Sequence, residues 1–311
     1  MSELRTLFAL VLLFWRLRPA LVHLVTIKPV VYGGLAARLS PVKAVVAAIS
    51  GLGTVFLAEG WLARLRRSLV VWMYQGALGG RRVAVIFQNE EDRRVLLREA
   101  GLARARIYLI PGSGVSLADF RHQPEPSGRA RIIMASRLLV DKGVRDYVEA
   151  AGELRRRGVE ASCILVGEPD PGNPNTISEQ EFRRWREEGV VECLGFRTDI
   201  AELFSLSHIV VLPSYYGEGL PKVLVEAAAC GRAVVTTDHP GCRDAIVPGR
   251  SGVLVPPRYP AALADALEYL VRHPEVRMAM GQEGRRLAER CFAIEQVVTR
   301  HLDIYREVLD D

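Results

Sequence analysis

The stretch IVVLPSYYGEGLPKVLVEAAACG, residues 209–231, contains an apolar run, a loop with two glycines and a helical pattern. The run at residues 209–214 is short and rich in β-branched side chains, which is typical of a strand buried on both faces. Pro221 suits the first turn of a helix, because its missing N–H costs nothing there, and Gly231 suits the position just past a helix end. A strand, a loop and a helix in this order indicate a parallel α/β sheet.

The same pattern recurs throughout the second half of the chain. Further apolar runs are RIIMAS (131–136), SCILVG (162–167), VVECLG (190–195), AVVTTD (233–238) and GVLVPP (252–257). Helical patterns separate these runs, and one of them ends at Gly158. Alternating strands and helices predict a doubly wound sheet, whose ligands bind at the carboxyl ends of the strands.

Two carboxylates lie on either side of the turn in the opening stretch. Gly217 and Gly219 allow the backbone to turn tightly around Glu218 and to approach a ligand closely. Glu226 lies on the helix among apolar neighbours, where a carboxylate needs hydrogen-bond donors. The two hydroxyls of a ribose are suitable donors. We therefore expect Glu226 to hold a nucleoside, while Glu218 and the helix N-terminus at Gly219 and Leu220 face a phosphate.

A loop with two cations follows the first strand of the same half. In SRLLVDKG (136–143), Arg137 and Lys142 precede a helix whose N-terminus adds backbone N–H groups and a positive dipole end. A guanidinium fork and an ammonium suit two adjoining phosphates. The loop therefore indicates a pyrophosphate site, although a solvated cationic loop has the same pattern.

The chain length and the charge distribution divide the protein into two halves. A chain of 311 residues suits two domains, which we place at residues 1–127 and 128–290, followed by a helix at residues 291–311 that packs back toward the first domain. Residues 1–127 contain 17 Lys and Arg against 8 Asp and Glu, whereas the remainder contains 24 against 28. The basic first half indicates an anionic partner, such as phospholipid, nucleic acid or a phosphorylated substrate, or else a solvated arginine-rich surface.

The cysteines and the apolar segments indicate the cellular compartment of the protein and whether it spans a membrane. The five cysteines form no C-x-x-C pair and no zinc-like spacing with histidine, which fits a reducing cytoplasm. The segment LFALVLLFW (7–15) is shorter than the roughly 20 residues of a membrane span, so we predict a buried helix that leads into a strand. For WLARLRRSLVVW (61–72), an amphipathic core helix is favoured over a membrane-facing helix.

Four motifs in order resemble glycosyltransferase family 4, whose members are retaining enzymes of the GT-B fold, with two Rossmann-like α/β domains. They are SRLLVDKG, VGEPDPGNP (166–174), the pair Glu218 and Glu226, and TTDHPGCRDAIVPGRSGVLVPP (236–257). The resemblance covers nearly all of residues 20–290. It implies that a sugar is transferred from a nucleotide diphosphate with retention of configuration, without a metal or another cofactor.

The resemblance also implies roles for single residues. The positions that match Arg137 and Lys142 contact the donor diphosphate, the one that matches Glu218 lies by the donor sugar, and the one that matches Glu226 holds the ribose. The catalytic candidates are therefore Glu218, Arg137 and Lys142. The donor-binding candidates are Glu226, Gly217, Gly219, Leu220, Gly167, Glu168 and Phe196.

The first half is similar to bacterial enzymes that add N-acetylhexosamine to undecaprenyl-diphosphate-linked saccharides. The similar segments include VHLVTIKPVVYGGLAAR (22–38), FQNEEDRRVL (87–96) and LIPGSGVSLADF (109–120). This resemblance implies a UDP-sugar donor, a lipid-linked saccharide acceptor and no nucleic acid. It also implies a cytoplasmic enzyme that lies peripherally on the anionic inner face of the plasma membrane. His23 and Lys28 are the acceptor-side candidates.

The chain departs from the family at its beginning. Family members usually start with a strand and a glycine-rich loop before anything like PALVHLVT (19–26), so we expect the first domain to be truncated or the start site to be misassigned. A non-catalytic fragment that binds nucleotide sugars and a UDP-sugar epimerase of the same fold remain the alternatives. A nicotinamide dehydrogenase is disfavoured, because GSGVSL (112–117) lacks the third glycine of G-x-G-x-x-G.

Overall fold

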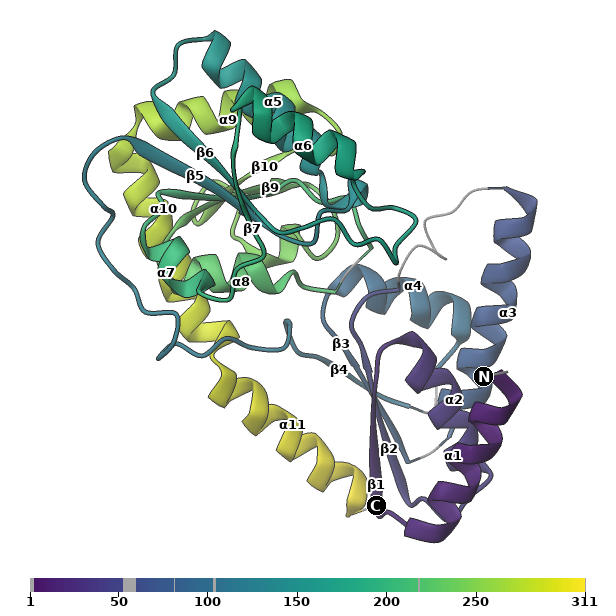
Figure 1. Cartoon of the computed structure of the whole chain (residues 1–311). Coiled ribbons are helices and arrows are strands. Elements are labelled where there is room, and N and C mark those ends of the chain that lie inside the picture. Colours follow the sequence, from purple (N-terminus) through teal and green to yellow (C-terminus); the bar gives the residue numbers. More distant parts are fainter. Residues whose placement is uncertain (1–2, 53–59, 81, 103–104, 218, 311) are drawn as a thin grey trace. The chain divides into compact units, whose positions relative to one another are not determined.

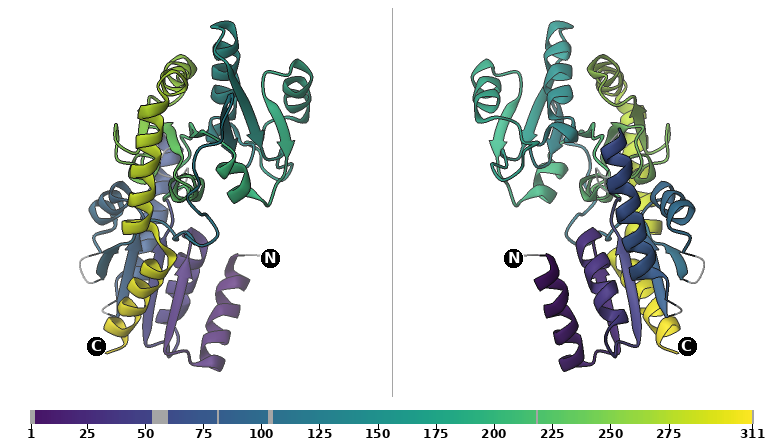
Figure 2. Two further views of the ribbon diagram at one scale, coloured as in Figure 1. Left: turned by 90° about the vertical axis from the view of Figure 1, so that its left-hand side faces the viewer. Right: turned by 90° about the vertical axis from the view of Figure 1, so that its right-hand side faces the viewer.

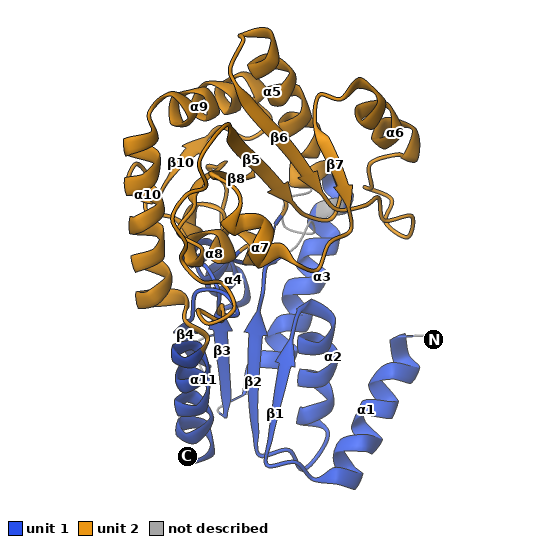
Figure 3. Ribbon diagram, turned by 60° about the vertical axis from the view of Figure 1, so that its left-hand side comes forward, with its two compact units in different colours: residues 1–113, 217–220, 295–311 blue, residues 114–216, 221–294 orange. Residues whose placement is uncertain are grey.

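Two compact units make up the computed structural model, which describes residues 3–52, 60–80, 82–102, 105–217 and 219–310. Unit 1 contains Met1–Ser113, Gly217–Leu220 and Glu295–Asp311, and unit 2 contains Gly114–Tyr216 and Pro221–Ile294 (Figure 3). Unit 2 thus begins earlier than the predicted residue 128. The chain also returns to unit 1 twice, once in the loop of the opening stretch and once at its C-terminal helix.

The sheet of unit 1 is entirely parallel. Its strands lie in the order β1-β2-β3-β4 and are β1 (Leu21–Val25), β2 (Ala44–Ile49), β3 (Val83–Phe87) and β4 (Arg106–Leu109). All side chains of β2 and β3 are buried. Such strands need cover on both faces, because successive side chains point to opposite sides.

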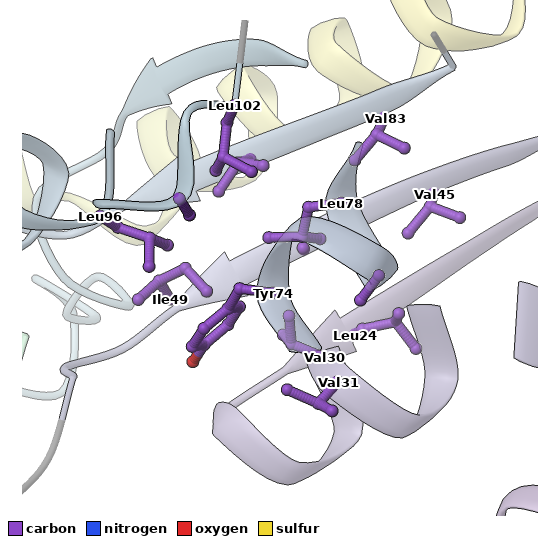
Figure 4. Packing of buried hydrophobic residues seen from close by; sticks show 14 of the residues in the cluster. Leu24, Val30, Val31, Val45, Ile49, Tyr74, Leu78, Val83, Leu96 and Leu102 are labelled. Carbon is purple, nitrogen blue, oxygen red and sulfur yellow. The ribbon is translucent and has the colours of Figure 1, made fainter. Parts of the chain in front are cut away.

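Helices cover the two faces of this sheet differently. One face packs with α1 (Glu3–Leu17), α2 (Ile27–Arg38), α3 (Trp61–Leu78) and α4 (Glu90–Ala100) in the larger core cluster (Figure 4). Val45 and Ala47 belong to this cluster, whereas Ala44 and Val46 belong to a second one with Val297, Ile304 and Val308 of α11 (Ile294–Leu309). Figure 2 shows α11 on the side of the sheet opposite to α1 and α2.

The sheet of unit 2 is also parallel, and its strand order is β10-β9-β8-β5-β6-β7. Its strands are β5 (Ala130–Ala135), β6 (Ala161–Val166), β7 (Glu192–Gly195), β8 (Ile209–Leu212), β9 (Ala233–Thr237) and β10 (Gly252–Val255). Counted along the chain, this is the dinucleotide-fold order 3-2-1-4-5-6, whose order reverses between β5 and β8. The six predicted apolar runs are confirmed as these strands.

Helices alternate with these strands (Figure 1). They are α5 (Val144–Arg156), α6 (Glu179–Glu188), α7 (Ile200–Ser205), α8 (Lys222–Ala229), α9 (Pro260–Arg272) and α10 (Pro274–Leu287). Shorter helical turns are η2 (Val140–Lys142), η3 (Arg243–Ala245) and η4 (Ala288–Phe292). The predicted doubly wound fold is confirmed, and Gly158 and Gly231 follow α5 and α8 with left-handed backbones at φ 69° each.

The two apolar segments of the first half agree with their predictions to different extents. Residues 7–15 lie in α1, which leads into β1 as expected, but Phe14 is the only side chain of this helix that is fully buried. The prediction of a buried helix is therefore wrong for most of α1. Among the described side chains of α3, Tyr74, Ala77 and Leu78 near its end are buried. Val70 and Val71 of α3 pack partly buried against the core, so the amphipathic core helix predicted for residues 61–72 contacts the core on one side, while its other side is exposed. None of the helices in the described ranges is long and apolar enough to cross a membrane.

Candidate functional site

A cavity of about 450 Å³ lies in unit 2 at the carboxyl ends of β5, β6 and β7 and beside α8. Its volume is in the range of small-molecule sites. The residues that line it are Ala135, Ser136, Arg137, Val166, Gly167, Glu168, Pro169, Asp170, Pro171, Phe196, Arg197, Ile200, Val223 and Glu226. It therefore brings together Arg137, Gly167, Glu168, Phe196 and Glu226, five of the residues that the sequence predicts for donor binding or catalysis.

Two glycines let the strand-end loops of unit 2 pass close to one another. A Cβ on Gly167 would collide with the carbonyl oxygen of Ser136, and a Cβ on Gly143 would collide with that of Pro213. Both glycines have left-handed φ angles, 135° and 76°. Gly143 is the last residue of SRLLVDKG. Its place in that motif is the sequence feature that could have predicted this close approach.

The loop after β8 is hydrogen-bonded to the loop after β5. The Tyr215 amide donates to the Asp141 carbonyl at 2.9 Å, and the Ser214 hydroxyl donates to the same oxygen at 3.3 Å. Lys142 follows directly in η2, where it is buried, with its Nζ 5.2 Å from the centre of the Tyr216 ring. The reversal point between β5 and β8 therefore holds Lys142 in a defined place, although Lys142 does not line the cavity.

Glu226 is the most buried acid of the cavity. Its side chain is 13% exposed, and Oε1 lies 3.5 Å from Nζ of Lys222, one turn earlier on α8. Burial raises the pKa of Glu226, and the ammonium of Lys222 opposes this rise in part. Such a carboxylate retains capacity to accept hydrogen bonds from a ligand that enters the cavity.

Arg137 is the strand-end cation of the cavity. Its side chain is 58% exposed, and Nη1 lies 3.9 Å from Oδ2 of Asp170. A pair this exposed is held weakly, so an anionic ligand can compete with Asp170 for the guanidinium. Sequence reasoning did not single out Asp170, although it lies inside VGEPDPGNP, in the loop after a predicted strand.

The far side of the cavity is formed by the loops after β6 and β7. The Phe196 amide donates to Oε1 of Glu168 at 3.3 Å, which links the two loops. The Phe196 ring is 71% exposed at the cavity. An exposed aromatic ring beside a carboxylate offers a face on which a planar base can stack.

Gly217, Gly219 and Leu220 belong to unit 1 and are not among the described residues that line the cavity. Glu218 lies outside the described residues, and the loop is described on both sides of it. The Gly219 amide donates to the Ser50 carbonyl at 3.0 Å, and the Leu220 amide donates to Oε1 of Gln88 at 3.3 Å. The two amides that we expected to meet a phosphate therefore have protein acceptors in this structure.

Both acceptor-side candidates lie in unit 1. His23 is in the middle of β1 and not at a strand end, and its Nδ1 shares a 2.7 Å hydrogen bond with the Tyr305 hydroxyl of α11. Burial lowers the pKa of His23, and nearby His301 lowers it further. Lys28 is exposed, with Nζ 3.2 Å from Oε1 of Glu3. These contacts give His23 a structural partner on the helix that covers the sheet.

In the part of the chain that the structure describes, no group of three or more His, Cys, Asp or Glu side chains could hold a metal ion. The polar groups of the cavity are instead the guanidinium of Arg137 and the carboxylates of Glu168, Asp170 and Glu226.

Comparison with known protein families identifies the chain. A family described as "Glycosyl transferases group 1" matches residues 116–287, which is more than half of its length. The chain belongs to this family. A second family, described as "Glycosyl transferase 4-like", matches residues 1–89. The predicted family and enzyme class of this group 1 glycosyltransferase are thereby confirmed.

Two curated relatives are each 28% identical to this glycosyltransferase. One is the N,N'-diacetylbacillosaminyl-diphospho-undecaprenol alpha-1,3-N-acetylgalactosaminyltransferase of Campylobacter jejuni, aligned over 89% of this chain and 74% of its own length. The other is the alpha-D-kanosaminyltransferase of Streptomyces kanamyceticus, aligned over 72% of this chain and 60% of its own length.

Solved structures have the same architecture. Sucrose-phosphate synthase from Thermosynechococcus elongatus matches with a TM-score of 0.82 at 21% identity, over 98% of this chain and 77% of that one. HepE from Anabaena, solved in complex with UDP, matches with a TM-score of 0.79 at 19% identity, over 97% and 82%. These likenesses confirm the predicted GT-B fold.

Proposed function

We propose that this group 1 glycosyltransferase moves a sugar, with retention of configuration, from a UDP-sugar to a polyprenyl-diphosphate-linked saccharide. We infer N-acetylhexosamine as the sugar and surface glycan synthesis as the pathway class. The observation that carries the donor half of the proposal is Glu226, a mostly buried carboxylate that lines a cavity at the strand ends of a dinucleotide-type sheet.

The nucleoside occupies the cavity of unit 2 in this proposal. Glu226 accepts hydrogen bonds from the two ribose hydroxyls, which satisfies a carboxylate that burial otherwise disfavours. The uracil stacks on Phe196, between loops that Glu168 and Gly167 hold in place. The UDP complex of HepE, a protein with this fold, supports the choice of nucleotide.

The diphosphate lies toward the cationic loop after β5. Arg137 releases Asp170 and pairs with one phosphate, and Lys142 approaches the other. The two cations neutralise the charge without a divalent metal. They contribute more as the reaction proceeds, because negative charge builds on the leaving phosphate.

Transfer requires a bond to form on the face of the sugar from which the phosphate departs. The acceptor hydroxyl oxygen bonds to the anomeric carbon as the bond between that carbon and the phosphate oxygen breaks, and the departing phosphate takes the hydroxyl proton. Glu218 lies by the donor sugar in this proposal and is not a nucleophile. Gly217, Gly219 and Leu220 form the turn that follows the phosphates, once the last two exchange their present acceptors for phosphate oxygens.

The acceptor half of the proposal is supported by the name of the Campylobacter relative and by the basic first half of the chain. An undecaprenyl-linked saccharide is presented at the inner face of the plasma membrane, whose anionic lipids attract arginine-rich surfaces. The enzyme therefore acts in the cytoplasm, peripherally at that membrane. His23 and Lys28 are the acceptor-side candidates of unit 1.

Titration calorimetry with UDP and with uridine tests the donor site. We expect UDP to bind equally well with and without a chelator. Glu226→Gln should weaken UDP and uridine alike, because both contain the ribose, whereas Lys142→Ala should weaken UDP and spare uridine. Equal losses for both ligands in both variants, or a requirement for metal, would contradict these roles.

A transfer assay with a lipid-diphosphate saccharide tests the reaction. We expect product only when both a UDP-N-acetylhexosamine and the acceptor are present. Glu218→Gln should lower the rate and leave donor affinity within about threefold. Conversion of the free UDP-sugar without acceptor would identify an epimerase, and UDP binding without transfer to any acceptor would identify a non-catalytic binding protein.

A further inference from the structure

Helix α3 of unit 1 carries an apolar stripe that faces solvent. Trp61, Leu65, Leu69 and Trp72 are 73%, 63%, 56% and 68% exposed, and Leu62 beside them is 51% exposed. At about 100° per residue, the four lie within an arc of about 80° over three turns. They therefore form one continuous strip and not scattered surface residues.

Arginines border this stripe on both sides. Arg64 and Arg66 are exposed and lie about 60° beyond its two edges. Arg67 points elsewhere, because its Nε donates to Oε2 of Glu99 at 2.7 Å. The helix contains no acidic residue. Long cationic side chains beside an apolar strip can keep their aliphatic parts in apolar surroundings while the charge stays with anions.

The two tryptophans stand at the two ends of the stripe. Their amphipathic rings favour the level of lipid headgroups, where one edge meets acyl chains and the other meets water. A protein partner at this surface would need acidic side chains opposite the exposed arginines. The first half of this chain has a large basic excess, so a second copy would repel it.

We propose that α3 is the surface by which this enzyme lies on an anionic bilayer. The stripe Trp61–Leu65–Leu69–Trp72 enters the boundary between headgroups and acyl chains, with the helix axis parallel to the membrane plane. Arg64 and Arg66 contact lipid phosphates on either side. The inference rests on the proposed function for its choice of a membrane, because a lipid-linked acceptor is found there.

Sedimentation of the full chain with vesicles tests this surface without donor or acceptor. The vesicles are phosphatidylcholine alone, or phosphatidylcholine with about one third phosphatidylglycerol. We expect the wild type to bind the anionic vesicles much more tightly, and raised salt to weaken that binding. Leu65→Gln with Leu69→Gln should lower binding by at least about 30-fold, because two side chains no longer enter the bilayer. Arg64→Gln with Arg66→Gln should lower binding to anionic vesicles by about 30-fold and change binding to neutral ones little.

Helix α11 offers a matched control. Val298 and Leu302 are also exposed, at 47% and 44% against 63% and 56% for Leu65 and Leu69, but α11 contains three acids beside its arginines. Val298→Gln with Leu302→Gln should therefore leave vesicle binding within about twofold of the wild type. An equal loss in this control would show a non-specific apolar effect and overturn the assignment to α3.

Two further outcomes would overturn the proposal. One is wild-type vesicle binding by both α3 variants. The other is a wild-type dimer in analytical ultracentrifugation that Leu65→Gln with Leu69→Gln converts to monomer, which would make the stripe a contact between copies. UDP binding is the separate readout for the proposed function, since the predicted nucleoside cavity lies entirely in unit 2. Vesicle binding without UDP binding would support α3 as the membrane surface and contradict the proposed transferase function.

Discussion

Helix α5 of unit 2 and helix α3 of unit 1 both have apolar side chains at helical spacing, but in opposite surroundings. In α5, Val144, Tyr147 and Leu154 are buried, and the Tyr147 hydroxyl donates to the Ile132 carbonyl at 2.9 Å. In α3, Trp61 and Trp72 face solvent. The comparison teaches that apolar periodicity establishes an apolar face but does not say what that face contacts.

The difference follows from what lies beneath each helix. The strand β5 beside α5 is buried almost throughout, so the apolar face of the helix completes a core. Among the described side chains of α3, those that are buried begin at Tyr74, near its C-terminal end, while Val70 and Val71 pack partly buried against the core. The face with Trp61, Leu65 and Leu69 is exposed. An apolar face that no neighbour covers is available to a partner.

Leucine-to-glutamine substitutions in the two helices should differ most in their effect on the free energy of unfolding. Leu154→Gln should destabilise the protein by about 4 kcal/mol, because it removes a buried side chain and buries an amide without a partner. Leu69→Gln, at a position 56% exposed, should change the free energy of unfolding by less than about 0.5 kcal/mol. Denaturant unfolding followed by circular dichroism measures both, and equal costs would show that α3 is packed as α5 is.

Two glycines allow a smaller test of how tightly unit 2 is packed. Gly143→Ala should cost about 3 kcal/mol, since it combines a left-handed backbone with a collision against the Pro213 carbonyl. Gly158→Ala has a similar φ but nothing within 4 Å of its Cβ, so it should cost only about 1 kcal/mol. The difference between the two variants in the same unfolding assay isolates the close approach of the two loops. A Gly143→Ala protein as stable as Gly158→Ala would refute that close approach.

Unit 2 also buries a histidine whose charge should control its stability. His208 is 2% exposed, and its Nδ1 accepts the Arg131 amide at 3.0 Å, so Nε2 carries the proton toward the Pro126 carbonyl. Burial lowers the pKa of His208 in the folded state, so the unfolded chain binds the proton more readily. The corresponding stability is present above about pH 6.5 and is lost as the pH falls through the lowered folded value.

Unfolding between pH 5 and pH 8 measures this effect, with His208→Gln as the comparison. The free energy of unfolding of the wild type should exceed that of the variant by less as the pH falls. This decrease should be smaller than the cost of Gly143→Ala. A constant difference across this range would mean that His208 does not titrate between the two states.

The smallest expected effect concerns the predicted ribose contact. Burial raises the pKa of Glu226, so the ionised carboxylate opposes folding, and stability falls as the pH rises through that raised value. Glu226→Gln should therefore leave the ligand-free protein as stable at neutral pH or slightly more stable, while UDP binding weakens. Glu168→Gln, at an exposed acid of the same cavity, is the control and should leave stability unchanged. Destabilisation by Glu226→Gln would point to a structural role.

Much of unit 2 and part of its site could be predicted from the sequence. Apolar runs of strand length, separated by helices that end at Gly158 and Gly231, determine the parallel sheet, because local propensity and burial agree there. The sequence could place Arg137 and Glu226 at the cavity, because one follows a predicted strand and the other lies on the helix after the next strand of the sheet. The crossing at Gly143 and the partner of Arg137, Asp170, depend on loops distant in sequence that meet only in the folded chain.

The sequence by itself therefore determined the family, the alternation of strands and helices, and several residues of the candidate cavity. Only the tertiary structure decided which apolar faces are buried. It also decided that His23 of β1 is hydrogen-bonded to Tyr305 of α11, and that the amides of Gly219 and Leu220 already have acceptors. The physical reason is that strands and helices form through neighbours along the chain. Burial and hydrogen-bond satisfaction depend instead on which distant segments pack together.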